Sequence, residues 1–497
     1  MASAQISGTR SDAKGASRRA FLGGLPSVVA GVVLFRGGVS PGDSRIMPPD
    51  DGRRAIRLTA TGSDRATAYG MSSKCVLLDG QHLLCSWLDV ARQNQWALVD
   101  TNRGEVVRRG SVGPPRSDNH CGVALCVAPD AAAHCMVGAH GGSFMHYRMP
   151  ADGDRANWHL IQEAIGQAAT YPSLVCDGDG TLHLTYRRST PRPYDVMYCR
   201  RRREDTAWSE PRPLVSAAVP VHTWTTHALE VGSTGRIHLV LSNTQTLSDG
   251  AWYYGASHLY SDDIGESWQQ LGDVRPLVLP AGAGTLKRIE GTAFDAHRTQ
   301  SREAKRRLPA AGPSQYYYYK ILLSNPVIDD AGRPWIVVHN LLRGEADLYH
   351  ADESTWTGVP LGEAVRTAIP NHRISHMGQL SRHHDGTIEV VLTVVPDGVA
   401  SHRYGSTGTK LVRLLADAAG TPRTCQLVCE PDSEGIPDWQ PNIQRPAVNA
   451  AISRPALLWT RGVNSHALTE THTNVNEVTT EVWLQLPPSG NHYPGGR

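Results

Sequence analysis

Two histidines that lie twenty residues apart are candidates for acid–base chemistry. His120 ends the run SDNH before an apolar stretch, and His140 ends the run VGAH after the next one. A neutral imidazole, with an unperturbed pKa of about 6.5, is a suitable proton acceptor near neutral pH. One hairpin separates the two residues, so both can return to the same end of a sheet. The segment YPSLVCDGDGTLHLTYRRSTPRPYDVMYCRRR (171–202) adds tyrosines and arginines at predicted strand ends.

A repeated unit supplies the strands that must position these side chains. Each copy is a turn with Asp or Gly followed by an alternating strand, and the copies lie at 78–89, 128–140, 177–188, 232–243, 329–340, 383–395 and 447–462. Their spacing of roughly fifty residues is typical of one four-stranded propeller blade. Seven copies predict an all-β fold, a seven-bladed β-propeller with four-stranded antiparallel blades. The alternatives, a β-helix or two β-sandwiches, predict other repeat lengths.

The N-terminal segment has the pattern of an export signal. The run SRRAFLG (17–23) matches the twin-arginine pattern S-R-R-x-F-L-K at all but its last position. The apolar run that follows, 25–35, is too short to span a bilayer. We therefore expect a signal peptide and linker at 1–45, a propeller domain at 46–497 with a loop insertion near 279–320, and a periplasmic or secreted mature protein.

Composition narrows the class of partner. The net charge of +2 in 497 residues shows no bias toward nucleic acid or membrane surfaces. We also expect a monomer. Nine cysteines, an odd number, leave at least one thiol unpaired within the chain. Most lie in apolar runs, which favours buried and inert thiols. Cys425 and Cys429 are spaced so that they could pair.

The run SDDIGESW (261–268) fits the spacing S-x-D-x-G-x-[ST]-W, the Asp-box of sialidases and many other propellers. Its Asp and Ser side chains are expected to fix a turn by bonding nearby backbone, and its Trp to anchor the hairpin by burial. The motif is therefore structural. The F/Y-R-I-P segment typical of sialidases is missing, which argues against that activity.

The segments 117–148 and 171–202 together resemble the BNR-repeat propeller family. The matching features are D-N-H, a turn with P-D, G-x-H twenty residues on, and then Y-P-S-L-x-x-D-x-D-G-x-L-H-L-T-Y-R-R. That family includes ulvan lyases and related enzymes that act on rhamnose–glucuronate linkages. The resemblance implies a groove for acidic polysaccharide. It also implies catalytic roles for His120, His140, Tyr186 and Arg200.

β-Elimination, the lyase reaction that the resemblance implies, suits these residue types. It removes the C5 proton of a uronic acid and expels the group on O4. An Arg or a metal ion can stabilise the charge that develops on the carboxylate. We expect His120 and Tyr186 to be the acid–base pair, His140 a substrate contact or second acid–base group, and Arg200 the neutralising group.

Further basic and polar side chains are expected to line the central groove and contact an anionic sugar chain. No metal-ligand set is convincing in the sequence, so the cofactor is left open, with calcium or zinc as possibilities. An α-L-rhamnosidase or another hydrolase on the same linkage, and a non-catalytic glycan-binding propeller, are the alternatives. The expected substrate contacts are Asn119, Arg187, Arg188, His222, His227, Arg373 and His376.

Overall fold

The computed structural model describes residues 53–488, except for 152–156, 192–193, 218–222, 247–251, 292–320, 341–342, 353, 377, 400–405, 407, 429–434, 446–451, 453 and 464–477. These residues belong to one compact unit, Ser44–Arg497. Among the described residues, the regular elements are strands apart from one short helix, α2 (Gly362–Ala368). The chain is therefore an all-β protein, as its sequence predicts.

The strands form six sheets in the described part of the chain, and their pairs are antiparallel except for one short parallel pair in the largest sheet. The first two strands of the described chain belong to two different sheets. One contains β2 (Cys75–Leu77), β3 (His82–Leu88), β4 (Asn94–Asp100) and β5 (Glu105–Val112). The other contains β28 (Asp438–Ile443), β29 (Leu457–Arg461), β30 (Thr480–Leu486) and β1 (Arg54–Gly62).

Three further sheets follow one another along the chain from residue 223 to residue 427. The first contains β13 (Thr223–Val231), β14 (Ile237–Thr246), β15 (Trp252–Ser261) and β17 (Glu290–Gly291). The second contains β18 (Ile321–Leu323), β19 (Val327–Ile328), β20 (Pro334–Asn340), β21 (Glu345–Ala351) and β22 (Trp356–Pro360). The third contains β23 (His372–Ile374), β24 (Gln379–Arg382), β25 (Ile388–Pro396), β26 (Lys410–Ala416) and β27 (Pro422–Leu427).

The sixth sheet has eight strands rather than four, because one long strand serves two meanders. β9 (His159–Cys176) pairs with β8 (His140–Met149) along its first part and with β10 (Leu182–Arg188) along its last part. The sheet is completed by β6 (Ala124–Val127), β7 (Ala133–Val137), β11 (Asp195–Arg201), β12 (Arg212–Ser216) and β16 (Ala281–Gly282). This sheet carries most of the residues that the sequence marks for chemistry.

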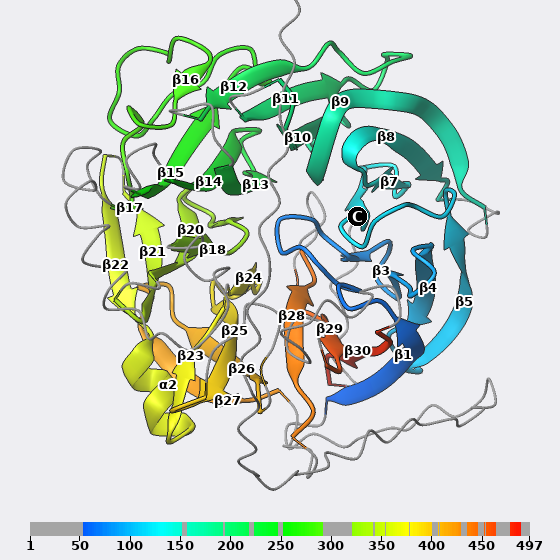
Figure 1. Cartoon of the computed structure of the whole chain (residues 1–497), viewed down its shortest axis with the longest axis vertical. Coiled ribbons are helices and arrows are strands. Elements are labelled where there is room, and N and C mark those ends of the chain that lie inside the picture. Colours follow the sequence, from blue (N-terminus) through cyan, green and yellow to red (C-terminus); the bar gives the residue numbers. More distant parts are fainter. Residues whose placement is uncertain are drawn as a thin grey trace, which may run out of the picture. The chain divides into compact units, whose positions relative to one another are not determined.

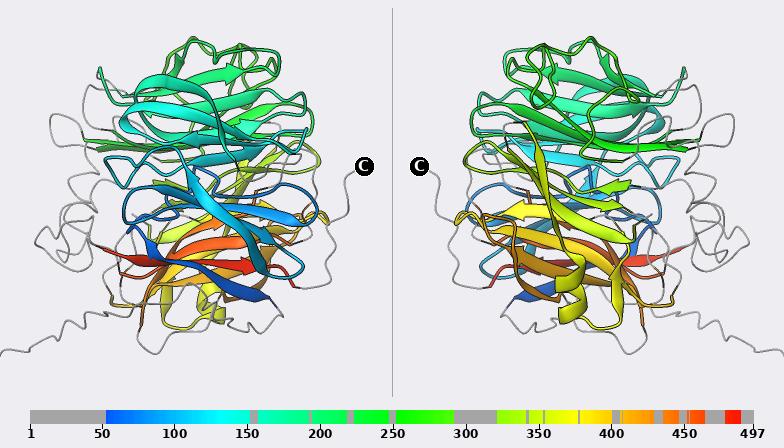
Figure 2. Two further views of the ribbon diagram at one scale, coloured as in Figure 1. Left: turned by 90° about the vertical axis from the view of Figure 1, so that its right-hand side faces the viewer. Right: turned by 90° about the vertical axis from the view of Figure 1, so that its left-hand side faces the viewer.

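The sheets follow one another around a common centre in chain order (Figure 1), and Figure 2 shows them side-on. The ring is closed by β1, which pairs antiparallel with β30 although more than 400 residues separate Arg54 from its partner Leu486. Apolar side chains pack between neighbouring sheets. Leu214 of β12 and Leu239 of β14, for example, belong to one buried cluster. Because each sheet buries both faces against its neighbours, the strand ends are left as the exposed rims.

Each predicted repeat contains the strand expected of it. The second strands of the successive meanders are β3, β7, β10, β14, β20, β25 and β29, and each lies within or overlaps its repeat. The turn at 261–268 is also built as expected. Asp263 accepts hydrogen bonds from the backbone N–H and hydroxyl of Ser267, and Trp268 is fully buried.

The described cysteines are mostly buried free thiols, as their apolar surroundings in the sequence predict. Seven of those described are buried and Cys425 is half-buried, all as free thiols, while Cys429 lies outside the described residues. Most of the predicted insertion at 279–320 and most of the first half of the last repeat lie outside them too. The described part of the chain contains no helix with the length and apolar character of a membrane span.

Candidate active site

Two loops meet at one rim of the ring and bring the candidate residues together. The loop between β5 and β6 carries Asp118, Asn119 and His120. The buried amide of Asn119 donates to Asp64 Oδ1 at 2.7 Å, which fixes this loop to the one between β1 and β2. Asn119 therefore holds the site together, and its predicted role as a substrate contact stays untested.

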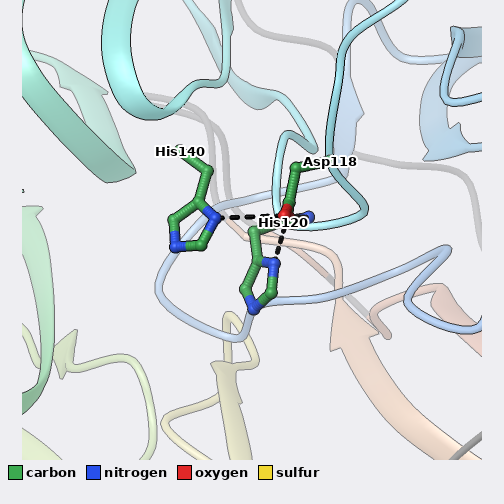
Figure 3. Close-up of side chains that lie close together, drawn as sticks. All are labelled: Asp118, His120 and His140. Atoms are coloured by element: carbon green, nitrogen blue, oxygen red, sulfur yellow. Dashed lines mark hydrogen bonds and ion pairs between the residues drawn. The ribbon is translucent and has the colours of Figure 1, made fainter. Parts of the chain in front are cut away.

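Asp118 bridges the two histidines that the sequence singles out (Figure 3). Its Oδ2 lies 3.2 Å from Nδ1 of His140, and its Oδ1 contacts Nδ1 of His120. The imidazole rings stack with centroids 4.3 Å apart. The prediction that one hairpin brings these histidines to the same end of a sheet is confirmed. The sequence analysis did not include Asp118 as a functional residue, although it lies in the same run as His120.

The two histidines differ in which nitrogen is available. His120 has both ring nitrogens engaged, because Nε2 contacts the guanidinium of Arg65 while Nδ1 contacts Asp118. Within the described residues, the ring nitrogens of His140 are held through Nδ1 alone, and its side chain is 36% exposed against 17% for His120. A hydrogen bond from Nδ1–H to a carboxylate fixes the tautomer with a lone pair on Nε2. His140 is therefore built to accept a proton from outside.

Electrostatics favour a neutral imidazole at His120 beside a charged Asp118 carboxylate. Burial of Asp118 would raise its pKa, but hydrogen bonds from His120 and His140 outweigh that effect and hold the pKa well below its usual range. Burial and the positive charge of Arg65 lower the pKa of His120 to about 3, against the opposing effect of Asp118. His120 is thus neutral at physiological pH.

A β-bulge places a tyrosine and an arginine beside the histidines. Between the pairs Thr185–Ser173 and Arg187–Thr170, the β9 strand has one extra residue. Tyr171 lies in this bulge with φ of 62°, a conformation rarely adopted by bulky side chains. Its ring centroid lies 6.2 Å from that of His120. Bulges near active sites commonly redirect a side chain in this way.

Arg187 completes this part of the site. Its guanidinium carbon lies 4.7 Å from the ring centroid of Tyr171, and its side chain is 4% exposed. Within the described residues, Nε and Nη1 of Arg187 have no hydrogen-bond partner. A buried cation with unused donors is costly unless an anion completes it. His227, also a predicted contact, is buried against the backbone of Tyr171 and Thr185, and burial lowers its pKa to about 4.

Tyr186, the tyrosine predicted to act with His120, is not placed beside it. Successive strand residues point to opposite faces, so Tyr186 points away from the face that Arg187 occupies. Its ring packs edge-on against Phe144 with centroids 5.5 Å apart and is 1% exposed. Burial raises the pKa of its phenol well above the usual range. Tyr171, together with Tyr69 at 5.9 Å from His120, occupies the position predicted for Tyr186.

Arg200, the predicted neutralising arginine, is also placed elsewhere. It lies on β11, and its guanidinium contacts Glu266 and the carbonyl of Ile264 in the 261–268 turn. That pairing reaches 66 residues along the chain and ties two sheets together. Arg188 is likewise engaged, since its guanidinium bonds the buried carboxylate of Asp195. Among the described arginines, Arg65 contacts His120 directly, and Arg187 lies against Tyr171.

The remaining predicted contacts lie on other sheets or outside the described residues. Arg373 of β23 donates to the carbonyl of Val399 at 2.6 Å. The carbonyl of the buried His376 accepts from His339 at 3.2 Å. His222 lies outside the described residues. Their roles in substrate binding stay predictions.

The sequence analysis found no convincing metal-ligand set, but the folded chain brings one together. One ligand atom from each of Asp118, His120 and His140 lies within 4.8 Å of the others. Two imidazoles and a carboxylate are ligands that suit zinc and similar ions. The same three groups also form a hydrogen-bonded cluster in which both histidines contact one carboxylate. The set therefore fits either a metal site or a proton relay.

Comparison with known proteins agrees with this architecture. Residues 84–281 match the BNR repeat-containing family. No curated protein sequence matches the chain. Among solved structures, an ulvan lyase of polysaccharide lyase family PL25, bound to -[GlcA(1-4)Rha3S]-, has a TM-score of 0.58 at 12% identity, over 84% of this chain and 93% of its own.

A second polysaccharide lyase, Uly1, has a TM-score of 0.52 at 12% identity, covering 88% of this chain and 99% of its own. At this identity the likeness is one of fold, and the fold is propeller-like. The matched segment includes His120, His140, Tyr171 and Arg187. Residues 84–281 therefore carry the repeats of the BNR repeat-containing family, and the resemblance predicted from the sequence is confirmed.

Proposed function

We propose that this chain is an exported polysaccharide lyase that cleaves uronate-containing glycans of the rhamnose–glucuronate type by β-elimination. The observation that carries the proposal is the arrangement around Asp118. His140 is oriented through Nδ1, which leaves Nε2 for a substrate proton. The guanidinium of Arg187, whose Nε and Nη1 have no partner in the described residues, lies over Tyr171 nearby. The similarity in fold to an ulvan lyase bound to -[GlcA(1-4)Rha3S]- supports the same substrate class.

Each step of the elimination has a matching side chain. Arg187 pairs with the uronate carboxylate, which makes the C5 proton more acidic and stabilises the enediolate that forms. Nε2 of His140 takes the C5 proton. The electron pair then forms the C4–C5 double bond as the bond from C4 to O4 breaks. Tyr171 donates its phenolic proton to the departing oxygen. The imidazolium of His140 then releases its proton to solvent while Tyr171 takes one up from solvent, which restores both groups.

His120 acts through its neighbours rather than on the sugar. Both its nitrogens are engaged, so it holds Asp118 and Arg65 in place below His140. Asp118 in turn stabilises the imidazolium that forms on His140, as carboxylates do for catalytic histidines. This assigns His140 the role of base that the sequence analysis gave to His120 or Tyr186.

The surrounding fold suits a groove-binding enzyme. We infer seven blades, because the eight-stranded sheet consists of two meanders joined at β9, and each of the other five sheets contributes one. The pattern SRRAFLG at 17–23 supports export by the twin-arginine route before the signal is removed. We infer a monomer that acts outside the cytoplasm.

The test is the ultraviolet absorbance of the unsaturated uronate, measured while the purified chain acts on rhamnose–glucuronate polysaccharides. Free rhamnose is assayed in the same samples. A rise in absorbance that His140→Gln abolishes and Tyr186→Phe preserves supports the proposal. Free rhamnose without absorbance would replace it with a hydrolase. A rise that a chelator abolishes in wild type would assign the Asp118 cluster to a metal instead of a proton relay.

A further inference from the structure

A second polar cavity lies at the opposite ends of the strands that carry the candidate active site. Its volume is about 240 Å³. Arg148 lies eight residues beyond His140 on β8, which at about 3.3 Å per residue places it roughly 25 Å away. Arg201 pairs in register with Leu182, the first residue of β10, whereas Arg187 lies near the last. The cavity is lined by Ala128, Pro129, Asp130, His134, Arg148, Ile161, Gly180, Leu182, Arg201 and Arg203.

The charge of this cavity is positive. Three arginines line it against a single carboxylate, that of Asp130. Nη2 of Arg148 bonds Asp130 Oδ2 at 3.0 Å, so that carboxylate is already engaged. Two guanidinium groups, those of Arg201 and Arg203, remain without a carboxylate among the lining residues. The lining therefore carries an excess of positive charge.

Arg201 has unused hydrogen-bonding capacity in this cavity. Its Nε is buried and has no hydrogen-bond partner among the described residues. Burial lowers its pKa, and Arg148 adds to that effect while Asp205 opposes it. The neighbouring His134 is buried, and the charges of Arg148 and Arg201 contribute to a pKa of about 4. Positive groups thus converge on a space in which Asp130 is the one carboxylate among the lining residues.

We propose that this cavity binds a tetrahedral oxyanion, sulfate or phosphate, either free or as a sugar ester. Guanidinium groups match such anions because their fixed N–H pairs bond two oxygens at once. A tetrahedral anion offers oxygens in several directions, which suits arginines that approach from β8, β11 and the 201–205 turn. The site is separate from the proposed elimination chemistry and does not depend on it.

The experiment is isothermal titration calorimetry of the full folded chain with sodium sulfate and with sodium phosphate. Sodium chloride is added to keep the ionic strength constant. We expect saturable binding that weakens at least tenfold in Arg201→Met and in Arg203→Met. Arg202→Met, in the same turn but outside the lining, is the matched control and should bind as wild type does. The largely exposed Arg203 gives a second variant should Arg201→Met fail to fold.

Two outcomes would overturn the proposal: no saturable binding of either anion, or equal loss of binding in Arg202→Met. His140→Gln must retain binding, because loss there would place the anion at the candidate active site. A sulfated rhamnose–glucuronate disaccharide and its desulfated form then distinguish the sources. Tighter binding of the sulfated sugar than of inorganic sulfate assigns an ester, and the reverse assigns the free ion.

Discussion

The molecule contains two kinds of histidine pair that differ in accessibility. His120 and His140 stack with centroids 4.3 Å apart, and His134 and His146 stack at 5.2 Å. The first pair shares Asp118 at an exposed rim, with His140 36% exposed. The second pair is 6% and 0% exposed. In it, Nδ1 of His134 lies 2.9 Å from Nε2 of His146, whose Nδ1 accepts from the indole of Trp208.

The position along the strand explains the difference. His134 and His146 lie inside neighbouring strands of one sheet, where both side chains are buried. His238 and His258 repeat this arrangement on β14 and β15, with nitrogens 3.1 Å apart. His120 and His140 lie instead in a loop and at a strand start, where the sheet no longer covers them. A pair inside strands stabilises the fold, while a pair at the rim can reach a substrate.

The sharpest test of this comparison is His140→Gln. Loss of the base should reduce turnover by about a thousandfold, within the range of 10² to 10⁴ typical of general bases. The thermal unfolding midpoint should change little, because the side chain is partly exposed and its polar contact is with Asp118. Turnover is followed by unsaturated uronate formation and unfolding by circular dichroism. Retained turnover would remove His140 from the mechanism.

Arg187→Met tests the proposed neutralising charge. Turnover should fall by roughly a hundredfold or more, as when one preorganised donor is removed from an active site. Stability should hold or rise, because the substitution removes a buried charge whose Nε and Nη1 have no partner in the described residues. Arg200→Met is the control, and it should retain turnover because Arg200 contacts Glu266 instead. A fall in Arg200→Met alone would restore the role predicted from the sequence.

His146→Ala should produce the opposite pattern. The side chain is fully buried between His134 and Trp208, so its removal leaves a cavity and two polar groups without partners. We expect a loss of about 3 kcal/mol in the free energy of unfolding, near the upper end for ordinary substitutions. Turnover per folded molecule should stay within a few-fold of wild type. A large loss of turnover with normal stability would contradict the structural role of this pair.

These contrasts also show which features the sequence could predict. The strands after Asp or Gly turns were predictable because the turn chemistry is local. The pairing of His120 with His140 was predictable because both lie at strand ends one hairpin apart. The predicted position of Tyr186 was wrong, because alternation along a β-strand points its side chain to the face opposite Arg187. That alternation was already visible in the sequence.

The rest depended on contacts that no local pattern contains. The bulge that redirects Tyr171 arises from a register shift between β9 and β10. Arg65 reaches His120 across 55 residues, and Arg200 is drawn to Glu266 across 66. The continuity of β9 through two meanders, which merges two expected sheets into one, likewise follows from tertiary pairing. Long-range pairs of this kind become visible only once the sheets are arranged around their centre.

The smallest expected effect concerns how the buried pairs respond to acid. Burial, with a contribution from Arg236, lowers the pKa of His258 to about 3, below its unfolded value of about 6.5. Between these values the unfolded chain binds a proton that the native chain does not, so stability falls as pH falls below 6.5. His258→Gln keeps a polar group near His238 but removes this titration. Between pH 7.5 and pH 5.5 the free energy of unfolding should fall by about 1.4 kcal/mol less in the variant than in wild type.

Urea unfolding at both pH values measures this difference. His159→Gln, at an exposed position, is the control for the loss of a histidine. Equal losses in wild type and His258→Gln would mean that the interior pair takes up a proton in the native state, and the distinction between interior and rim histidines would then rest on solvent access alone.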